Sequence, residues 1–272
     1  MINYKPKLGG WAQDIKQPLE KGELQHPDLI LGDNLHALSA KALPNVIVEV
    51  NGVLDLRPWC STIEDQGHIG SCVGNGTVGA LEFLQIRNGV TLQELSRLFI
   101  YYNARLMTQE QDQDVGCYIR IAFATLSSLG TCSEAKWPYD VSKVFIRPSW
   151  GAYREAYPNK ITSFYRIASE GQERIEDIKF ALRSNHPIVF GMIIDDEYQK
   201  VGFDGRVLMP GNSRANPGGH CQMIVGYDNN TKCWLVRNSW GKNWACDGYA
   251  WAPWAYLDAS EANDFWVPTL NK

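Results

Sequence analysis

The sequence predicts an α+β protein with two lobes, the first helical and the second rich in strands. Residues 71–129 carry apolar side chains at helical spacing. Short β-rich runs bounded by turn residues follow from about residue 187. Helices gathered early in a chain and strands gathered late are typical of α+β proteins. The 272 residues are enough to bury a substantial core in a bilobal domain.

Three helices are expected in the first lobe, over residues 71–88, 91–106 and 118–129. Ser71 is a candidate cap for the first, and Asn88-Gly89 is a stop signal. The first half of this helix is rich in glycine, and each glycine costs about 0.5–1 kcal/mol of helix propensity relative to alanine. Close packing of its backbone on neighbouring chain would offset that cost. A buried central helix is therefore predicted.

The second lobe is expected to open with a helix over residues 172–184. Strands should follow over residues 187–194, 220–227, 233–238 and 248–254. We place the helical lobe at about 55–150 and the β-rich lobe at about 151–272. Residues 1–54 have a different character, punctuated by four prolines, and form an N-terminal extension. A short helix after Asp33 and an extended run over 46–50 are expected within it.

Composition limits the partners of the chain. The net charge is −4 and no block of Lys or Arg is present, so neither nucleic acid nor an anionic membrane is expected as a partner. No apolar run approaches the roughly 18 residues of a membrane span. The N-terminus lacks the apolar core of a signal peptide, which predicts a cytoplasmic location. A monomer is expected.

Seven cysteines are present and none forms a Cys-x-x-Cys pair, so no metal site is predicted. The neighbouring pair His220-Cys221 could suggest a metal, but neighbours on a strand point to opposite faces. Cys117, Cys132 and Cys233 are interpreted as buried small hydrophobic residues. No cofactor is expected.

Four short motifs carry the chemistry. They are Asp65-Gln66-Gly67, Gly70-Ser71-Cys72, Gly218-Gly219-His220 and Asn238-Ser239-Trp240-Gly241. Cys72 at a helix start is the candidate nucleophile, with its thiol pKa lowered by the helix dipole. His220 is the candidate base, and Asn238 would fix its tautomer. Gln66 would donate a hydrogen bond to an oxyanion, and Trp240 would shield the His220–Asn238 bond from water. These parts suit acyl transfer through a thioester.

These motifs resemble those of the papain-like cysteine peptidases, most closely the bacterial and viral branch. The resemblance covers roughly residues 55–266, including Leu95-Ser96-Arg97-Leu98-Phe99 and Trp137-Pro138-Tyr139-Asp140. Ile69 departs from it, since the family usually has a disulfide cysteine there. The resemblance implies a helical left lobe, a β-barrel-like right lobe and an active site in the cleft between them. It further implies a peptide or protein substrate.

The resemblance also suggests substrate contacts. Gly116 would pair with an extended peptide through its backbone. Gly191 and Gly218 would line a pocket for the side chain two residues before the scissile bond, with room for a bulky apolar group. Gly219 and Trp240 complete the candidate substrate-binding set.

Three alternatives remain open at this point. Residues 1–54 are either a wrap around the catalytic domain of residues 55–272 or an inhibitory pro-segment lying in the cleft as an intramolecular ligand. The same four groups would also serve an acyl transferase or deamidase, or remain in a protein that binds peptide without cutting it. Gly74-Asn75-Gly76-Thr77-Val78-Gly79 matches the dinucleotide fingerprint G-x-G-x-x-G, but no apolar strand precedes it.

Overall fold

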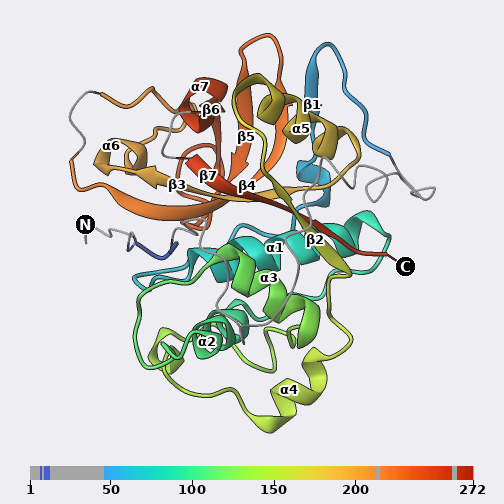
Figure 1. Ribbon diagram of the computed structural model, residues 1–272, viewed down its shortest axis with the longest axis vertical. Coiled ribbons are helices and arrows are strands. Elements are labelled where there is room, and N and C mark those ends of the chain that lie inside the picture. The colour runs from blue at the N-terminus through green and yellow to red at the C-terminus, as the bar shows by residue number, and fades with distance from the viewer. Residues whose placement is uncertain (1–6, 8, 13–45, 212–214, 259–261, 272) are drawn as a thin grey trace.

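The computed structural model describes residues 7, 9–12, 46–211, 215–258 and 262–271. Its two lobes meet along helix α1 (Cys72–Arg87) (Figure 1). On one side of α1 lies a twisted antiparallel sheet. On the other side lie α2 (Arg97–Met107) and α3 (Ile119–Ser128). The two-lobed α+β fold predicted from the sequence is confirmed.

The helical lobe is built on α1, α2 and α3, which contact one another pairwise. Two short helices complete it, namely η3 (Val141–Lys143) and α4 (Trp150–Ala156), while η2 (Arg57–Trp59) follows β1 and contacts α1 from the side of the sheet. The predicted start of α2 near residue 91 is wrong. Ser96 caps this helix by accepting from the Phe99 N–H at 3.2 Å, and the Leu95 N–H donates to the buried Glu82 carboxylate at 2.7 Å. These contacts hold the preceding residues outside the helix.

In the described residues of the second lobe, one antiparallel sheet is the main element. Its strands run in the order β2 (Ser163–Ile167), β7 (Ala262–Thr269), β3 (Ile188–Ile194), β4 (Gly218–Asp228), β5 (Cys233–Arg237) and β6 (Tyr249–Pro253). Strand β1 (Val53–Asp55) pairs with β4. Helices α5 (Gly171–Arg183), α6 (Asp196–Gln199) and α7 (Trp254–Asp258) accompany the sheet. The glycines of the G-x-G-x-x-G match lie inside α1 and follow no strand, so the dinucleotide interpretation fails.

The N-terminal extension joins the second lobe through a tight reversal of the chain. Val50 and Val53 exchange backbone hydrogen bonds of 2.8 and 3.0 Å around Asn51-Gly52. Strand β1 follows at once and spans the predicted boundary at residues 54/55. The run over 46–50, predicted as a strand or extended edge, pairs only through that bridge at Val50, and Val46 and Val48 are exposed. The short helix expected after Asp33 falls outside the described residues.

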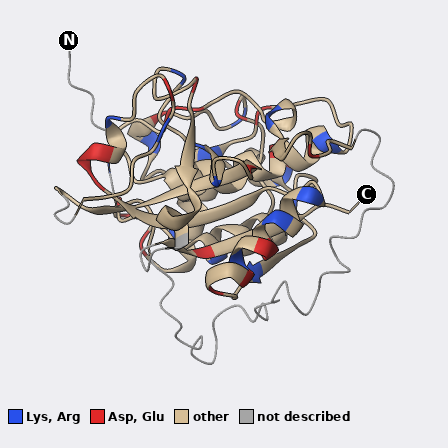
Figure 2. Cartoon of the chain, turned by 90° about the horizontal axis from the view of Figure 1, so that it is seen from above, with Lys and Arg blue, Asp and Glu red and all other residues tan. Residues whose placement is uncertain are grey.

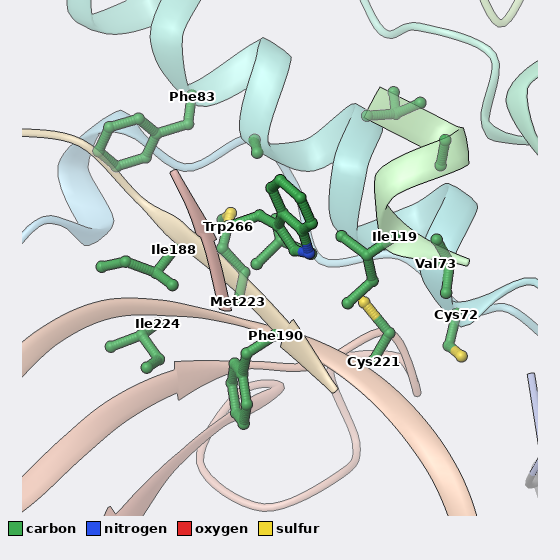
Figure 3. Packing of buried hydrophobic residues seen from close by; sticks show 14 of the residues in the cluster. Cys72, Val73, Phe83, Ile119, Ile188, Phe190, Cys221, Met223, Ile224 and Trp266 are labelled. Atoms are coloured by element: carbon green, nitrogen blue, oxygen red, sulfur yellow. The ribbon is translucent and has the colours of Figure 1, made fainter. Parts of the chain in front are cut away.

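The core lies where α1 meets the sheet. Cys221, Met223 and Trp266 pack from the sheet towards the helices, and Cys72 lies at the edge of the cluster (Figure 3). A Cβ on Gly74 would come within 2.9 Å of the Arg97 carbonyl oxygen, and one on Gly76 within 3.1 Å of Cys221 Sγ. The glycines of α1 therefore permit close approach to both lobes, as the buried central helix predicted from the sequence requires.

The surface agrees with the small net charge. Acidic and basic residues are intermingled over the elements seen in Figure 2. Among the residues that the structure describes, no helix combines the length and apolar character needed to cross a membrane.

Replacing Gly74 with alanine tests the close contact between α1 and α2. We expect Gly74→Ala to lower the free energy of unfolding by about 1–2 kcal/mol, because the clash with the Arg97 carbonyl outweighs the gain of about 1 kcal/mol in helix propensity. Gly79→Ala is the matched control, since its Cβ would lie at an ordinary 3.5 Å from Arg237 Nη1. Urea denaturation should show Gly79→Ala to be neutral or slightly stabilising. Equal effects at the two positions would contradict this account.

Candidate active site

Cys72 is the first residue of α1 and its side chain is fully buried. The Cys221 backbone N–H lies close enough to its sulfur to act on the thiol pKa, so the thiol lies against β4 next to the residue that follows His220. Ser71 does not cap the helix with its side chain, contrary to the prediction. Its hydroxyl instead contacts the Tyr139 hydroxyl and accepts from Asn75 Nδ2 at 3.1 Å.

The hydrogen bonds around His220 define its tautomer. Asn238 Oδ1 accepts from the Ser239 backbone N–H at 2.8 Å, which fixes the orientation of the amide. The same oxygen lies 2.7 Å from His220 Nε2, so Nε2 must carry the proton. His220 Nδ1 is buried and has no hydrogen-bond partner among the described residues. Trp240 stacks on the imidazole with ring centroids 4.5 Å apart.

Gln66 is buried and held on both sides of its amide. Its Oε1 accepts from Ser239 Oγ at 2.8 Å, and its Nε2 donates to the Ile69 carbonyl at 3.2 Å. The backbone carbonyl of Gln66 accepts from the Tyr139 hydroxyl at 2.7 Å. Because the Tyr139 hydroxyl also contacts Ser71, it joins the Gln66 loop to the residue that precedes Cys72.

Burial dominates the electrostatics of the site. It raises the pKa of the Cys72 thiol to about 12, and backbone hydrogen bonds from Cys221, Val73 and Cys72 itself only partly oppose this. Burial also lowers the pKa of His220 to about 4, against the opposing effect of the Asn238 hydrogen bond. The lowered thiol pKa predicted from the helix start is therefore wrong for the site as it stands. Both groups are neutral at pH 7 in this state.

Residues of the N-terminal extension cover the site. The Gly10 carbonyl accepts from the Cys117 N–H at 3.1 Å, and the Ala12 N–H donates to the Cys117 carbonyl at 3.1 Å. The Gly9 N–H donates to the Gly219 carbonyl at 2.8 Å on the other lobe. A Cβ on Gly10 would come within 2.8 Å of Cys72 Sγ. Residues 9–12, which we call the covering segment, thus bridge both lobes over the thiol.

The Trp11 side chain is buried against the second lobe. Its indole N–H donates to Asp264 Oδ2 at 3.2 Å, and its ring lies where a Cβ on Gly191 would clash. A Cβ on Gly219 would come within 2.7 Å of the Trp11 carbonyl oxygen. We call the space between Gly191, Gly219 and Asp264 the Trp11 site.

Lys7 adds an ionic contact to the covering segment. Its Nζ lies 2.6 Å from Asp114 Oδ2, while Asp114 Oδ1 accepts from the Gly70 N–H at 2.9 Å and the Tyr101 hydroxyl at 2.5 Å. Burial acts to raise the pKa of Asp114, but the hydrogen bonds from Lys7, Tyr101 and Gly70 outweigh it and the pKa is lowered. The carboxylate therefore stays charged in mild acid and holds Lys7.

The predicted substrate glycines fall in different places. Gly116 (φ +82°) lies against the Gly10 backbone, and Gly191 and Gly219 border the Trp11 site. Gly218 begins β4 and pairs with Ile194. Sequence reasoning missed Trp11, Asp114, Tyr139 and Asp264. Tyr139 lies in the Trp137-Pro138-Tyr139 motif, which was noted without a role; the other three had no local signal.

The thiols and potential metal ligands give two further findings. All seven cysteines are free, and Cys117 and Cys132 are buried as predicted whereas Cys233 is half-buried. Within the part of the chain that the structure describes, no group of three or more His, Cys, Asp or Glu side chains is arranged to hold a metal ion.

Comparison with known proteins agrees with this geometry. The sequence model of one protein family, described as papain family cysteine protease, matches residues 52–254, which is most of the chain. This chain belongs to the papain family of cysteine proteases. By family it is a cysteine peptidase, a hydrolase, as the sequence predicted.

Relatives occur in viruses and bacteria. An uncharacterized peptidase C1-like protein of Acanthamoeba polyphaga mimivirus is 38% identical over 244 residues, covering 85% of this chain and 77% of that protein. A viral cathepsin of the Spodoptera exigua nuclear polyhedrosis virus is 26% identical, covering 70% of this chain and 52% of that protein. The crystal structure of xylellain, a cysteine protease from Xylella fastidiosa, is 30% identical with a TM-score of 0.80 over the whole of both chains.

Replacing Gly10 tests whether the covering segment protects the thiol. In the full chain we expect Gly10→Ala to speed alkylation of Cys72 by iodoacetamide at least about tenfold, because the added Cβ would meet the Gly70 carbonyl at 2.5 Å and Cys72 Sγ at 2.8 Å. Peptide mapping should show unchanged labelling of the exposed Cys246, which serves as the internal control. An unchanged rate at Cys72 would mean that the segment does not limit access.

Proposed function

We propose that this chain hydrolyses peptide bonds through a thiolate–imidazolium pair formed by Cys72 and His220, and that residues 9–12 restrain it. The observation that carries the proposal is the fixed tautomer of His220. Its Nε2 proton is committed to Asn238, and Nδ1 is left as the basic nitrogen on a strand that contacts the Cys72 sulfur. A base with a defined tautomer beside a thiol suits nucleophilic catalysis.

The reaction follows in two balanced steps. His220 Nδ1 takes the thiol proton, Cys72 Sγ attacks the substrate carbonyl carbon, and the imidazolium returns the proton to the departing amine. A thioester and the first product result. Water then attacks the thioester with His220 as base, which releases a carboxylic acid and restores the thiol. The Asn238 hydrogen bond supports the imidazolium in both steps.

The developing oxyanion would be stabilised by the Gln66 side-chain N–H and the Cys72 backbone N–H. Ser239 holds the Gln66 amide from one side, and Tyr139 holds the backbone of its loop. Since Tyr139 also contacts Ser71, one hydroxyl sets the distance between the two donors. Positioning of this kind lowers the barrier because the donors need no reorganisation when charge develops.

The covering segment supports a restrained resting state. It hydrogen-bonds to both lobes, keeps Gly10 over the thiol, fills the Trp11 site and is held by the Lys7–Asp114 ion pair. A peptide substrate would need the space that this segment occupies. Displacement would rehydrate Cys72 and His220, so the thiol pKa would fall and the imidazole pKa would rise. Both changes favour the reactive ion pair.

Removing the extension and the thiol tests this function directly. A chain that begins at Val46 keeps the Val50–Val53 reversal and β1, so it should fold and cleave a fluorogenic peptide at least about tenfold faster than the full chain. Cys72→Ala in either form should abolish turnover with an unchanged circular dichroism spectrum. Product analysis with an added amine distinguishes hydrolysis from acyl transfer. A truncated chain that folds but cleaves no peptide would refute the proposal.

Tyr139→Phe tests the positioning of the oxyanion donors. We expect kcat for an amide substrate to fall about tenfold or more with KM little changed, because losing an oxyanion donor altogether costs on the order of 3 kcal/mol and this change only displaces one. Alkylation of Cys72, which forms no oxyanion, should keep its rate. Tyr153→Phe is the matched control, since its hydroxyl bonds Asn103 Oδ1 at 2.8 Å elsewhere in the lobe. Equal losses in both variants would indicate a structural effect only.

A further inference from the structure

Asp264 occupies an unusual position in the sheet. Val189 pairs with Trp266 but Gly191 pairs with Asn263, so β7 has one residue more than β3 between these pairs. Asp264 lies in this bulge with φ +62°, a left-handed conformation that Asp and Asn tolerate better than other side chains. Bulges of this kind redirect a side chain. Here the redirected carboxylate faces Trp11.

The carboxylate of Asp264 is 3% exposed and accepts from two indole groups. Trp266 Nε1 donates to Oδ1 at 2.6 Å from the same strand, and this partner belongs to the fold. Trp11 Nε1 donates to Oδ2 at 3.2 Å from the covering segment, and this partner leaves with the segment. A side chain that enters the Trp11 site in its place meets a buried carboxylate oxygen, a hydrogen-bond acceptor, at the far end.

The shape of the site suits a flat ring. Gly191 contributes no side chain where the indole lies, and a Cβ on Gly219 would meet Trp11 Cε3 at 3.1 Å. The two glycines leave room for an aromatic ring, and the Asp264 carboxylate can accept from an N–H donor on that ring. The sequence predicted a pocket for a bulky apolar side chain, lined by Gly191 and Gly218; the carboxylate of Asp264 adds a polar requirement to the space beside Gly191.

We propose that Asp264 is a specificity-determining residue, and that it favours peptides that place a tryptophan in the Trp11 site over peptides that place an apolar ring of the same size there. This inference rests on the proposed peptidase function for its substrate and deepens it. An occupant without a donor would lose the hydrogen bond to this buried acceptor, which makes such a site discriminate strongly.

A double-mutant cycle in the full chain tests the contact without any turnover. Trp11→Phe and Asp264→Gly should each speed alkylation of Cys72 roughly tenfold, because each removes the hydrogen bond that holds Trp11 in the second lobe. The double variant should be no faster than the faster single variant, since both changes remove the same bond. Glycine suits the positive φ at residue 264, so the bulge is preserved.

Lys7→Ala is the matched control for this cycle. It loosens the segment at Asp114, away from Asp264, so its effect should multiply with that of Asp264→Gly. If the fold-increases in alkylation rate caused by Trp11→Phe and Asp264→Gly multiply in the double variant, the inference is overturned. If Asp264→Gly does not fold, Asp264→Asn replaces it, and its smaller effect must still fail to multiply with Trp11→Phe.

A peptide pair tests selectivity in the full chain with Trp11→Ala, which vacates the site. Two fluorogenic peptides differ only in having tryptophan or 3-benzothienylalanine, its sulfur isostere without the N–H. We expect kcat/KM to favour tryptophan roughly tenfold or more and the ratio to approach one after Asp264→Gly. A ratio near one before that substitution overturns the inference. If neither peptide is cleaved while the alkylation cycle still shows coupling between Trp11 and Asp264, the result counts against the peptidase function. The contact between Trp11 and Asp264 is then still supported.

Discussion

The backbone of α1 is pressed against both lobes at once, and the rest of the site is placed by that contact. Gly74 lets the helix approach the Arg97 carbonyl of α2, and Gly76 lets it approach Cys221 on β4. The sulfur of Cys72 is thereby held against the strand that carries His220. A helix that kept its neighbours at ordinary side-chain distance would separate Cys72 from His220, the proposed nucleophile and base. The glycines lower helix propensity, but they allow this alignment.

The sequence predicted the parts of the site that have local signatures. Cys72, His220, Asn238 and Gln66 each belong to a short motif, and the structure brings their four segments together. Strand β7 was missed because it has no clear alternation, and Asp264 and Pro268 within it are poor strand formers; pairing with β2 and β3 overrides that preference. The location of Trp11 had no local signal, since it depends on contacts with residues more than a hundred positions away.

Burial has opposite effects on order and on reactivity at this site. The same enclosure that fixes the His220 tautomer and stacks Trp240 on it also raises the pKa of Cys72 and lowers that of His220. Both shifts disfavour charge separation between sulfur and imidazole. In the covered arrangement the side chains of the site are therefore in place, but Cys72 and His220 are both neutral. Reactivity therefore requires hydration of the thiol, which lowers its pKa, in addition to space for a substrate.

The covalent link between the covering segment and the rest of the chain has a consequence of its own. Ala12 and Val46 belong to one polypeptide, so under the proposed restraint the segment competes with substrate at a local concentration that does not depend on how dilute the protein is. Modest affinity is then enough to keep it in place. A single backbone cut between Ala12 and Val46 would break this covalent link. It would turn the covering segment into a separate peptide that diffuses away on dilution, so the proposed restraint of the peptidase would depend on protein concentration.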